Sequence, residues 1–190
     1  LAVKTDLTRR EEIDRLAAET LDAFGRLDFL VNNAADTGRD VFASFWDTDA
    51  ESWSRQFAVN VTAPFLLCKA FAGVMRDQGS GLIVNVTSGA AAMVDPPPRR
   101  PGVAGATYGP TKAALNRMTQ ALAADFYEAN VSIVSVDPGY TLTEIAEIVG
   151  TSQGLDPSAV KIQGADDNKP SHPFGDEVQT PPLSGSTGHH

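Results

Sequence analysis

Cysteine and histidine are scarce in this 190-residue sequence, and their positions exclude several kinds of site. Cys68 is the single cysteine, so neither an internal disulfide nor a cysteine metal cluster can form. We expect it to be a packed core thiol, because it lies in an apolar helical stretch. The histidines are His172, His189 and His190, all near the C-terminus. A histidine-rich metal site or a Ser/His/Asp triad therefore cannot be built in the rest of the chain.

Positive charge is also low, since 15 Lys and Arg against 24 Asp and Glu give a net charge of -9. Nucleic acids and anionic membranes bind clustered basic side chains, so we expect neither as a partner. No apolar run comes near the roughly 18 residues of a membrane span, and no charged-then-apolar leader opens the sequence. We therefore expect a soluble, cytoplasmic protein.

The composition predicts one folded domain followed by a tail. A hydrophobic content of 42% is enough for one sizeable core, which we assign to residues 1–150. Residues 151–190 hold five prolines and five glycines and show no sustained periodicity. We expect them to be poorly ordered.

Strand and helix patterns alternate along the domain. Short apolar runs predict strands at residues 1–3, 27–31, 82–86 and 131–136, and apolar residues at helical spacing predict helices over 8–24, 48–78 and 108–129. Capping boxes are expected at Thr8 with Glu11 and at Thr48 with Glu51. Gly25 should end the first helix, and Pro64 can kink the second. This alternation predicts a parallel sheet with right-handed crossovers.

The segment 81–112 carries the clearest chemical pattern. Tyr108 and Lys112 are four residues apart on a predicted helix, so they project from the same face. An ammonium beside a phenol favours the phenolate, so we expect the pKa of Tyr108 to be lowered from about 10 and the side chain to act as a general acid and base. Ser88 follows the predicted strand 82–86, at the end where doubly wound sheets bind ligands. Such a pair also occurs by chance on solvated helix faces, and that alternative stays open here.

Two further residues have structural alternatives. Asn60 lies inside the second helix, between Val59 and Val61, and is either a satisfied structural amide or a site residue. Taken alone, the structural role is favoured. Ser88 is not a hydrolase nucleophile, because Val86 stands where a nucleophile elbow has glycine and the fold has no histidine.

Together these residues resemble the classical short-chain dehydrogenase/reductase family over about residues 1–143. The matching positions follow the family's order: the Asp segment at Asp6, the Asn-Asn-Ala stretch at 32–34 with Ala35 replacing a glycine, Asn60, Ser88, the Tyr-x-x-x-Lys pair at Tyr108 and Lys112, and the nicotinamide-contacting segment at Pro138, Gly139, Thr141 and Thr143. The resemblance implies a Rossmann-like, doubly wound α/β sheet, incomplete because the family's first two strands and last strand are missing.

The resemblance also implies an activity. It indicates an oxidoreductase that interconverts an alcohol and a ketone or aldehyde with NAD or NADP, and that assembles as a homo-oligomer, a dimer or tetramer. The implied catalytic residues are Asn60, Ser88, Tyr108 and Lys112; the implied cofactor-binding residues are Asp6, Asn32, Ala34, Tyr108, Lys112, Pro138, Gly139, Thr141 and Thr143.

In that family, each catalytic residue has a distinct role. Tyr108 would exchange a proton with the substrate oxygen, while Lys112 would lower the pKa of Tyr108 and bind the nicotinamide ribose. Ser88 would hold the carbonyl or developing alkoxide. Asn60 would hold a water molecule of the proton relay.

The sequence departs from the family in three places. The Gly-rich dinucleotide loop is absent, since the only G-x-G, Gly79–Gly81, precedes a strand instead of following one. The missing strands would leave an unpaired apolar sheet edge. The C-terminus diverges, and a proline-rich insert over 95–102 separates Ser88 from Tyr108. Its Arg99 and Arg100 would either contact an acidic substrate or be solvated loop charges. The alternative to an enzyme is a catalytically silent, truncated paralogue acting as an assembly or regulatory partner.

Overall fold

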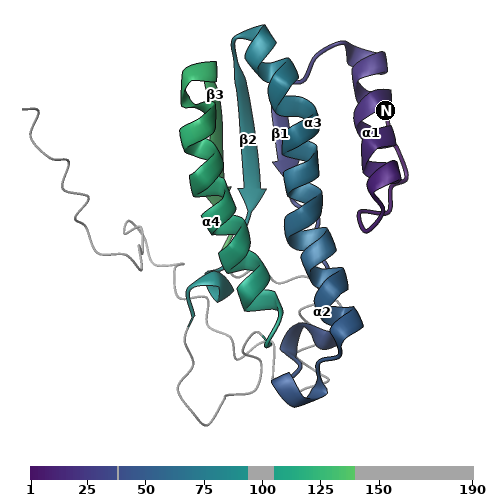
Figure 1. The fold of residues 1–190 in the computed structure, drawn as a ribbon, viewed down its shortest axis with the longest axis vertical. Coiled ribbons are helices and arrows are strands. Elements are labelled where there is room, and N and C mark those ends of the chain that lie inside the picture. Colours follow the sequence, from purple (N-terminus) through teal and green to yellow (C-terminus); the bar gives the residue numbers. More distant parts are fainter. Residues whose placement is uncertain (38, 94–104, 140–190) are drawn as a thin grey trace, which may run out of the picture.

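Three parallel strands form the sheet of the described structure. The computed structural model describes residues 1–37, 39–93 and 105–139. The strands β1 (Phe29–Asn32), β2 (Gly81–Val86) and β3 (Val131–Val136) lie in the order β1-β2-β3. The helices α1 (Arg10–Phe24), α3 (Ala63–Gln78) and α4 (Tyr108–Phe126) run along the sheet (Figure 1). The predicted α/β fold with a parallel sheet is confirmed.

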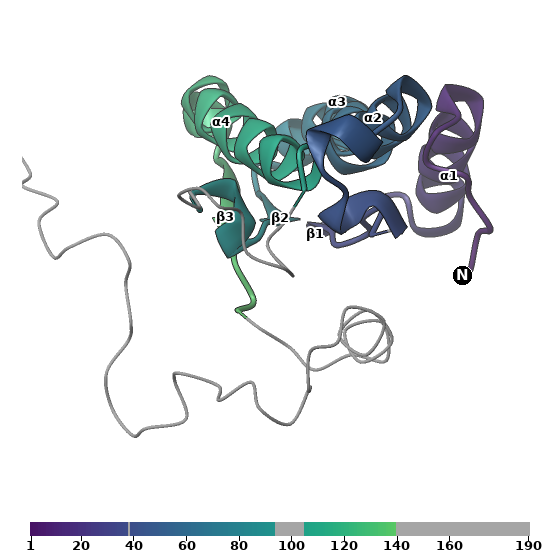
Figure 2. The ribbon, with the colours of Figure 1, turned by 90° about the horizontal axis from the view of Figure 1, so that it is seen from below.

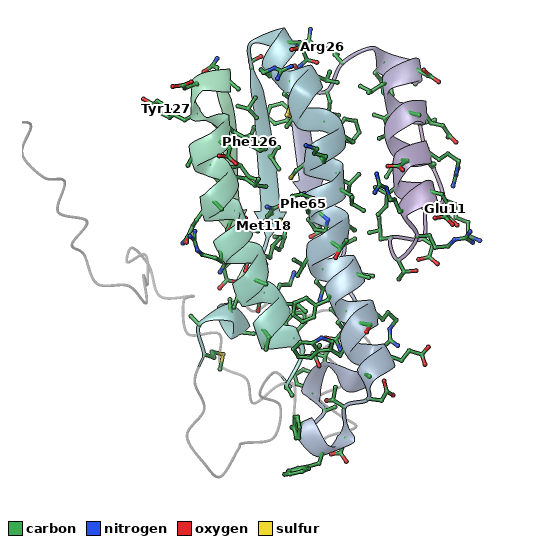
Figure 3. All side chains as sticks on the ribbon, viewed as in Figure 1. Glu11, Arg26, Phe65, Met118, Phe126 and Tyr127 are labelled. Atoms are coloured by element: carbon green, nitrogen blue, oxygen red, sulfur yellow. The ribbon has the colours of Figure 1, made fainter. Side chains whose placement is uncertain are left out.

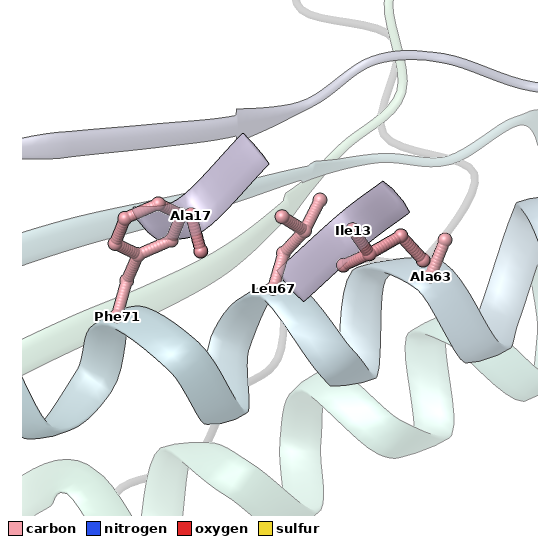
Figure 4. Packing of buried hydrophobic residues seen from close by; sticks show 5 residues of the cluster. All are labelled: Ile13, Ala17, Ala63, Leu67 and Phe71. Atoms are coloured by element: carbon pink, nitrogen blue, oxygen red, sulfur yellow. The ribbon is translucent and has the colours of Figure 1, made fainter. Parts of the chain in front are cut away.

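All three long helices cover the same face of the sheet (Figure 2). On α1, Ile13 and Ala17 pack against Ala63, Leu67 and Phe71 of α3 (Figure 4). A second cluster joins α3 to the sheet and consists of Cys68, Met75, Ile83, Val131 and Ile133. Cys68 is a buried core thiol, as predicted. Charged side chains such as Glu11 and Arg26 lie on the outer surface (Figure 3).

The first helix begins differently from its prediction and ends as expected. The backbone nitrogen and the hydroxyl of Thr8 both donate to Oδ1 of Asp6, at 2.9 and 2.7 Å. Thr8 therefore does not cap the helix, and the predicted capping box is wrong, because the nearby carboxylate is the stronger acceptor. The helix ends at Gly25, whose φ of 68° allows its N–H to reach the oxygen of Leu21 at 2.7 Å.

The second helical stretch also begins at a carboxylate. Asp49 is the N-cap of α2 (Ala50–Phe57) and accepts from the backbone nitrogen of Ser52 at 2.6 Å. The hydroxyl of Thr48 donates to the backbone oxygen of Ser44 at 2.7 Å instead. The capping box at Thr48 is therefore also wrong, because an adjacent aspartate caps the helix and favours its positive end.

A π-helical turn joins α2 to α3. This turn, η3 (Ala58–Thr62), is followed at once by Pro64 in the first turn of α3. Proline has no N–H to donate to the carbonyl of Asn60 four residues earlier, and the wider turn accommodates that loss.

The stretch Ala50–Gln78 is long and apolar enough to cross a membrane by length and composition, although the sequence pattern predicted no such run. Core helices of soluble proteins pass the same test.

β1 forms an edge of the described sheet. The predicted strand at residues 1–3 is wrong, because these residues have no neighbouring strand in the described part of the chain to bond with. Phe29 and Val31 project from β1 with exposed fractions of 67% and 58%. These side chains are exposed because no described helix covers the other face of the sheet (Figure 2). The expected unpaired edge is present in the described sheet, since β1 pairs with β2 on one side only.

Candidate active site

The implied catalytic residues come from three elements at the carboxyl end of the sheet. Ser88 lies two residues beyond β2, and Tyr108 and Lys112 lie in the first turns of α4. Asn60 lies in the π-helical turn, which contacts α4. The carboxyl ends of parallel strands are where such sheets bind ligands. The structure therefore brings together residues that lie up to 52 positions apart in the sequence.

Lys112 is buried beside Tyr108. Its side chain is 3% exposed, and Nζ donates to the backbone oxygen of Val86 at 2.8 Å. The same nitrogen lies 5.6 Å from the centre of the Tyr108 ring. Burial lowers the pKa of Lys112, because an ammonium loses hydration inside the protein. The predicted placement of the two side chains on one helix face is confirmed.

The phenol of Tyr108 is half-buried and bonded to Ser88. Burial raises the pKa of Tyr108, a hydrogen bond with the Ser88 side chain lowers it, and the charge of Asp137 raises it. The predicted lowering of this pKa is therefore wrong for the structure, since loss of hydration is the largest cause. The phenol is protonated at neutral pH and can donate a proton.

Asn60 is a fully buried amide with both ends bonded. Its Oδ1 accepts from the backbone nitrogen of Asp36 at 2.8 Å, and its Nδ2 donates to Oγ1 of Thr111 at 3.1 Å. The side chain therefore has the structural role favoured for Asn60 taken alone. Its function in holding a water molecule stays a prediction.

A buried polar ladder crosses the core beneath this site. Asn32 Nδ2 donates to Asn85 Oδ1 at 2.8 Å, and Asn85 Nδ2 donates to Thr119 Oγ1 at 2.9 Å. The Asn32 side chain also bonds to Cys68. Asn32, implied as a cofactor residue, thus uses its amide inside the core. Asn85 was not among the predicted site residues, although an amide within an otherwise apolar strand was a signal in the sequence.

The other implied cofactor residues lie around the ends of β1 and β3. Asn32 and Ala34 line a cavity of about 300 Å³ between β1, α1 and α3, which Leu7 also lines. Asp6 lies on the exposed approach to α1. Pro138 and Gly139 follow β3, where Oδ1 of Asp137 accepts from the nitrogen of Gly139 at 3.0 Å. The remaining predicted features lie outside the described residues: Thr141, Thr143, the insert 95–102 with Arg99 and Arg100, and the tail 151–190.

Three polar groups lie together at the sheet's carboxyl end: the hydroxyl of Ser88, the phenol of Tyr108 and the ammonium of Lys112. Pyrophosphate binds at a Gly-rich turn that leads from a strand into a helix. None of the described strands β1, β2 and β3 is followed by such a turn. The phosphate half of the site is therefore not built by the described residues.

The comparisons with known proteins identify the class. The short chain dehydrogenase family model matches residues 1–154, so the chain belongs to this family. An uncharacterized oxidoreductase of Thermotoga maritima is 37% identical over 134 residues, which cover 70% of this chain and 49% of the relative. A 3-oxoacyl-[acyl-carrier-protein] reductase of a Synechocystis strain is 34% identical over 147 residues, covering 77% and 56%.

Solved structures agree with the Rossmann-like fold. A short-chain dehydrogenase from Streptomyces avermitilis superposes with a TM-score of 0.67 at 31% identity, covering 81% of this chain and 60% of that one. NAD+-bound xylitol dehydrogenase gives a TM-score of 0.66 at 29% identity, covering 78% and 53%. A metagenomic short-chain oxidoreductase in complex with NADP gives 0.61 at 31% identity, covering 78% and 66%. The chain spans about half the length of the curated relatives it matches.

Proposed function

We propose that this chain carries the catalytic half of an NAD- or NADP-dependent oxidoreductase that interconverts a small-molecule alcohol and a ketone or aldehyde. One observation carries the proposal: a protonated phenol, Tyr108, is bonded to Ser88 and lies beside the buried ammonium of Lys112. Membership of the short chain dehydrogenase family supports it. So do the bound NAD+ and NADP of the two structural neighbours.

In this proposal each side chain has its own task. Ser88 orients the Tyr108 hydroxyl and can hold the substrate oxygen as negative charge develops on it. Tyr108 donates its proton to that oxygen in reduction and takes it back in oxidation. The cofactor supplies or accepts the hydride. Lys112 places a positive charge near the phenol, which stabilises the phenolate left after proton donation.

The phosphate half of the dinucleotide site must come from residues beyond those described. The matched relatives are about twice as long as the matched segment, which supports a second half that pairs with the β1 edge. The names of the relatives differ in substrate, so they support the reaction class and not one substrate. A cytoplasmic location and a homo-oligomeric state belong to the same proposal, on the grounds of charge and resemblance.

Cofactor titration tests the proposal. NADH and NADPH are titrated by fluorescence into the folded 190-residue chain and into the protein from its source. Saturable binding, followed by carbonyl reduction that Tyr108→Phe abolishes, is the expected result for the protein from its source. Binding with unchanged reduction in Tyr108→Phe contradicts the assigned proton donor.

A second candidate is a catalytically silent assembly or regulatory partner. The exposed β1 edge and the absence of a Gly-rich turn among the described residues favour it. The intact mass of the protein from its source discriminates the two. A mass well above 20.1 kDa favours the enzyme, and a mass of 20.1 kDa without cofactor binding favours the silent partner.

A further inference from the structure

Thr111 is a fully buried threonine in the first turn of α4, between Tyr108 and Lys112 in the sequence. Its hydroxyl donates to the backbone oxygen of Tyr108 at 2.8 Å. The same hydroxyl accepts from Nδ2 of Asn60 at 3.1 Å. One side chain therefore connects the residue that carries the phenol to the π-helical turn.

The connection extends to the loop after β1. Asn60 Oδ1 accepts from the backbone nitrogen of Asp36 at 2.8 Å, and Asp36 follows the segment 33–35 directly. The loop after β1, the π-helical turn and the first turn of α4 are thus joined by two side chains. These are the same elements that surround the proposed nicotinamide end of the site.

Loss of the Thr111 hydroxyl would leave Nδ2 of Asn60 without its acceptor. Asn60 is 0% exposed, so water does not reach the amide as the structure stands. A buried donor without an acceptor is unfavourable, and the turn would shift to relieve it. Threonine is also a weak helix former, so local helix propensity does not explain its presence here.

We propose that Thr111 is a positioning residue, whose hydroxyl holds the first turn of α4 against Asn60 and thereby sets the placement of the Tyr108 phenol in the site. The inference rests on the proposed function, because it assigns Thr111 a task in the same reaction. It acts through Tyr108 and Asn60 and does not itself contact the reacting atoms.

The same helix provides a matched control. Thr119 lies two turns further along α4 and is also buried. Its hydroxyl donates to the backbone oxygen of Leu115 at 2.8 Å and accepts from Nδ2 of Asn85 at 2.9 Å. Thr119 therefore has the bonding pattern of Thr111 without the link to Tyr108. Replacement of either threonine by valine removes one hydroxyl and leaves Nδ2 of one buried asparagine without its acceptor.

The titration of the Tyr108 phenol separates positioning from stability. Phenolate absorbance is measured against pH in the full chain and in Thr111→Val, Thr119→Val and Thr111→Ser, and the matching curve with Tyr108→Phe is subtracted from each. The subtraction removes the other tyrosines, including the exposed Tyr127 at the far end of α4 (Figure 3).

The environment of the phenol determines the direction of the expected shift. Within residues 1–37, 39–93 and 105–139, the charged groups beside Tyr108 are Lys112 on its own helix and Asp137 after β3. Neither η3 nor the turn η4 (Gly89–Ala91) contains a charged side chain, and α2, which also contacts α4, carries Glu51 and Arg55. Burial is the largest cause that raises the pKa of Tyr108. A loosened first turn admits water, so its midpoint should move towards the ordinary value of about 10.

We expect Thr111→Val to lower the midpoint by about half a pH unit, while Thr119→Val and Thr111→Ser leave it in place. An unchanged midpoint in Thr111→Val, or an equal shift in Thr119→Val, overturns the inference. If Thr111→Val does not fold, Thr111→Ala is measured instead, because it leaves room for water beside Asn60.

Kinetics give a second reading on the protein from its source. Thr111→Val should lower kcat about tenfold with little change in KM, and Thr111→Ser should restore it. An equal kcat in the unsubstituted protein, Thr111→Val and Thr111→Ser contradicts the inference. The phenol titration needs no cofactor. If the protein from its source binds neither NADH nor NADPH, the proposed function is refuted, while the titration still tests the role of Thr111.

Discussion

Asn32 and Asn85 occupy the same register position on neighbouring parallel strands, and Nδ2 of Asn32 donates to Oδ1 of Asn85 at 2.8 Å. Nδ2 of Asn85 in turn donates to Oγ1 of Thr119 on α4 at 2.9 Å. A polar ladder therefore holds β1, β2 and α4 together inside an apolar core. Buried ladders of this kind stabilise a fold when every member is bonded and destabilise it when one is removed.

Asn85→Leu should lower the free energy of unfolding by about 2 kcal/mol, because it removes the acceptor of Asn32 Nδ2 and the donor to Thr119 Oγ1 inside the core. Urea unfolding followed by circular dichroism measures the loss. Asn33→Leu is the control, since Asn33 is exposed and should change the free energy by less than about 0.5 kcal/mol. Equal losses in both variants would show that the ladder does not contribute.

Lys112→Met should make the chain more stable while abolishing any dehydrogenase activity. The Lys112 ammonium is buried and bonds to the backbone oxygen of Val86, and it forms no ion pair within the described part of the chain. An apolar side chain of similar length avoids the loss of hydration, so we expect a gain of about 1 kcal/mol at neutral pH. Thermal unfolding measures it, with the exposed Lys69→Met as control. A loss of stability larger than that of the control contradicts the prediction.

The stability of the chain should depend on alkaline pH through Tyr108. Burial raises the pKa of this phenol in the folded state, so the folded state binds the proton more tightly than the unfolded chain does. The contribution is fully present below the unfolded value of about 10 and is lost as the pH rises through the folded pKa. Tyr108→Phe should abolish this loss. Lys112 has the opposite effect: because burial lowers its pKa in the folded state, the free energy of unfolding rises with pH until the unfolded value of 10.5 is reached. The pH profiles with Tyr108 and with Tyr108→Phe are therefore compared in the Lys112→Met background. Parallel pH profiles with and without Tyr108 would contradict the assignment.

Cys68 should react with thiol reagents only after the chain unfolds. Burial raises the pKa of its thiol to about 11, so little thiolate is present at neutral pH. Because Cys68 is the single cysteine, the rate of labelling in increasing urea reports opening of the core beside Asn32. Fast labelling in the absence of urea, compared with a Cys68→Ser blank, is the contrary outcome.

Two glycine substitutions should have opposite effects. A Cβ at Gly81 would lie 2.6 Å from Cβ of Met75, so Gly81→Ala should lower the free energy of unfolding by about 1–3 kcal/mol. Gly73 lies within α3 and has no atom within 4 Å of such a Cβ. Gly73→Ala should therefore raise it by about 0.5–1 kcal/mol. Chemical unfolding of both variants checks the pair, and a stabilising Gly81→Ala would contradict the packing of Met75.

Local pattern alone was enough to determine much of the chain. Apolar periodicity predicted β3 at its observed bounds and α4 from its first residue, because short-range sterics and burial decide these elements. The order of the motifs around Asn60, Ser88, Tyr108 and Lys112 indicated the family, which the comparisons confirmed.

Tertiary structure decided what depends on competition between distant groups. Residues 1–3 form no strand because pairing needs a neighbouring strand. The capping boxes at Thr8 and Thr48 failed for a local reason, since Asp6 and Asp49 lie only two and one positions away. The pKa of Tyr108 is raised because burial outweighs the hydrogen bond with Ser88, and no spacing of residues reveals how deeply a phenol is buried. Likewise, the partners of Asn60 come from 24 and 51 positions away, so only the folded chain could show that its amide serves the framework of the site.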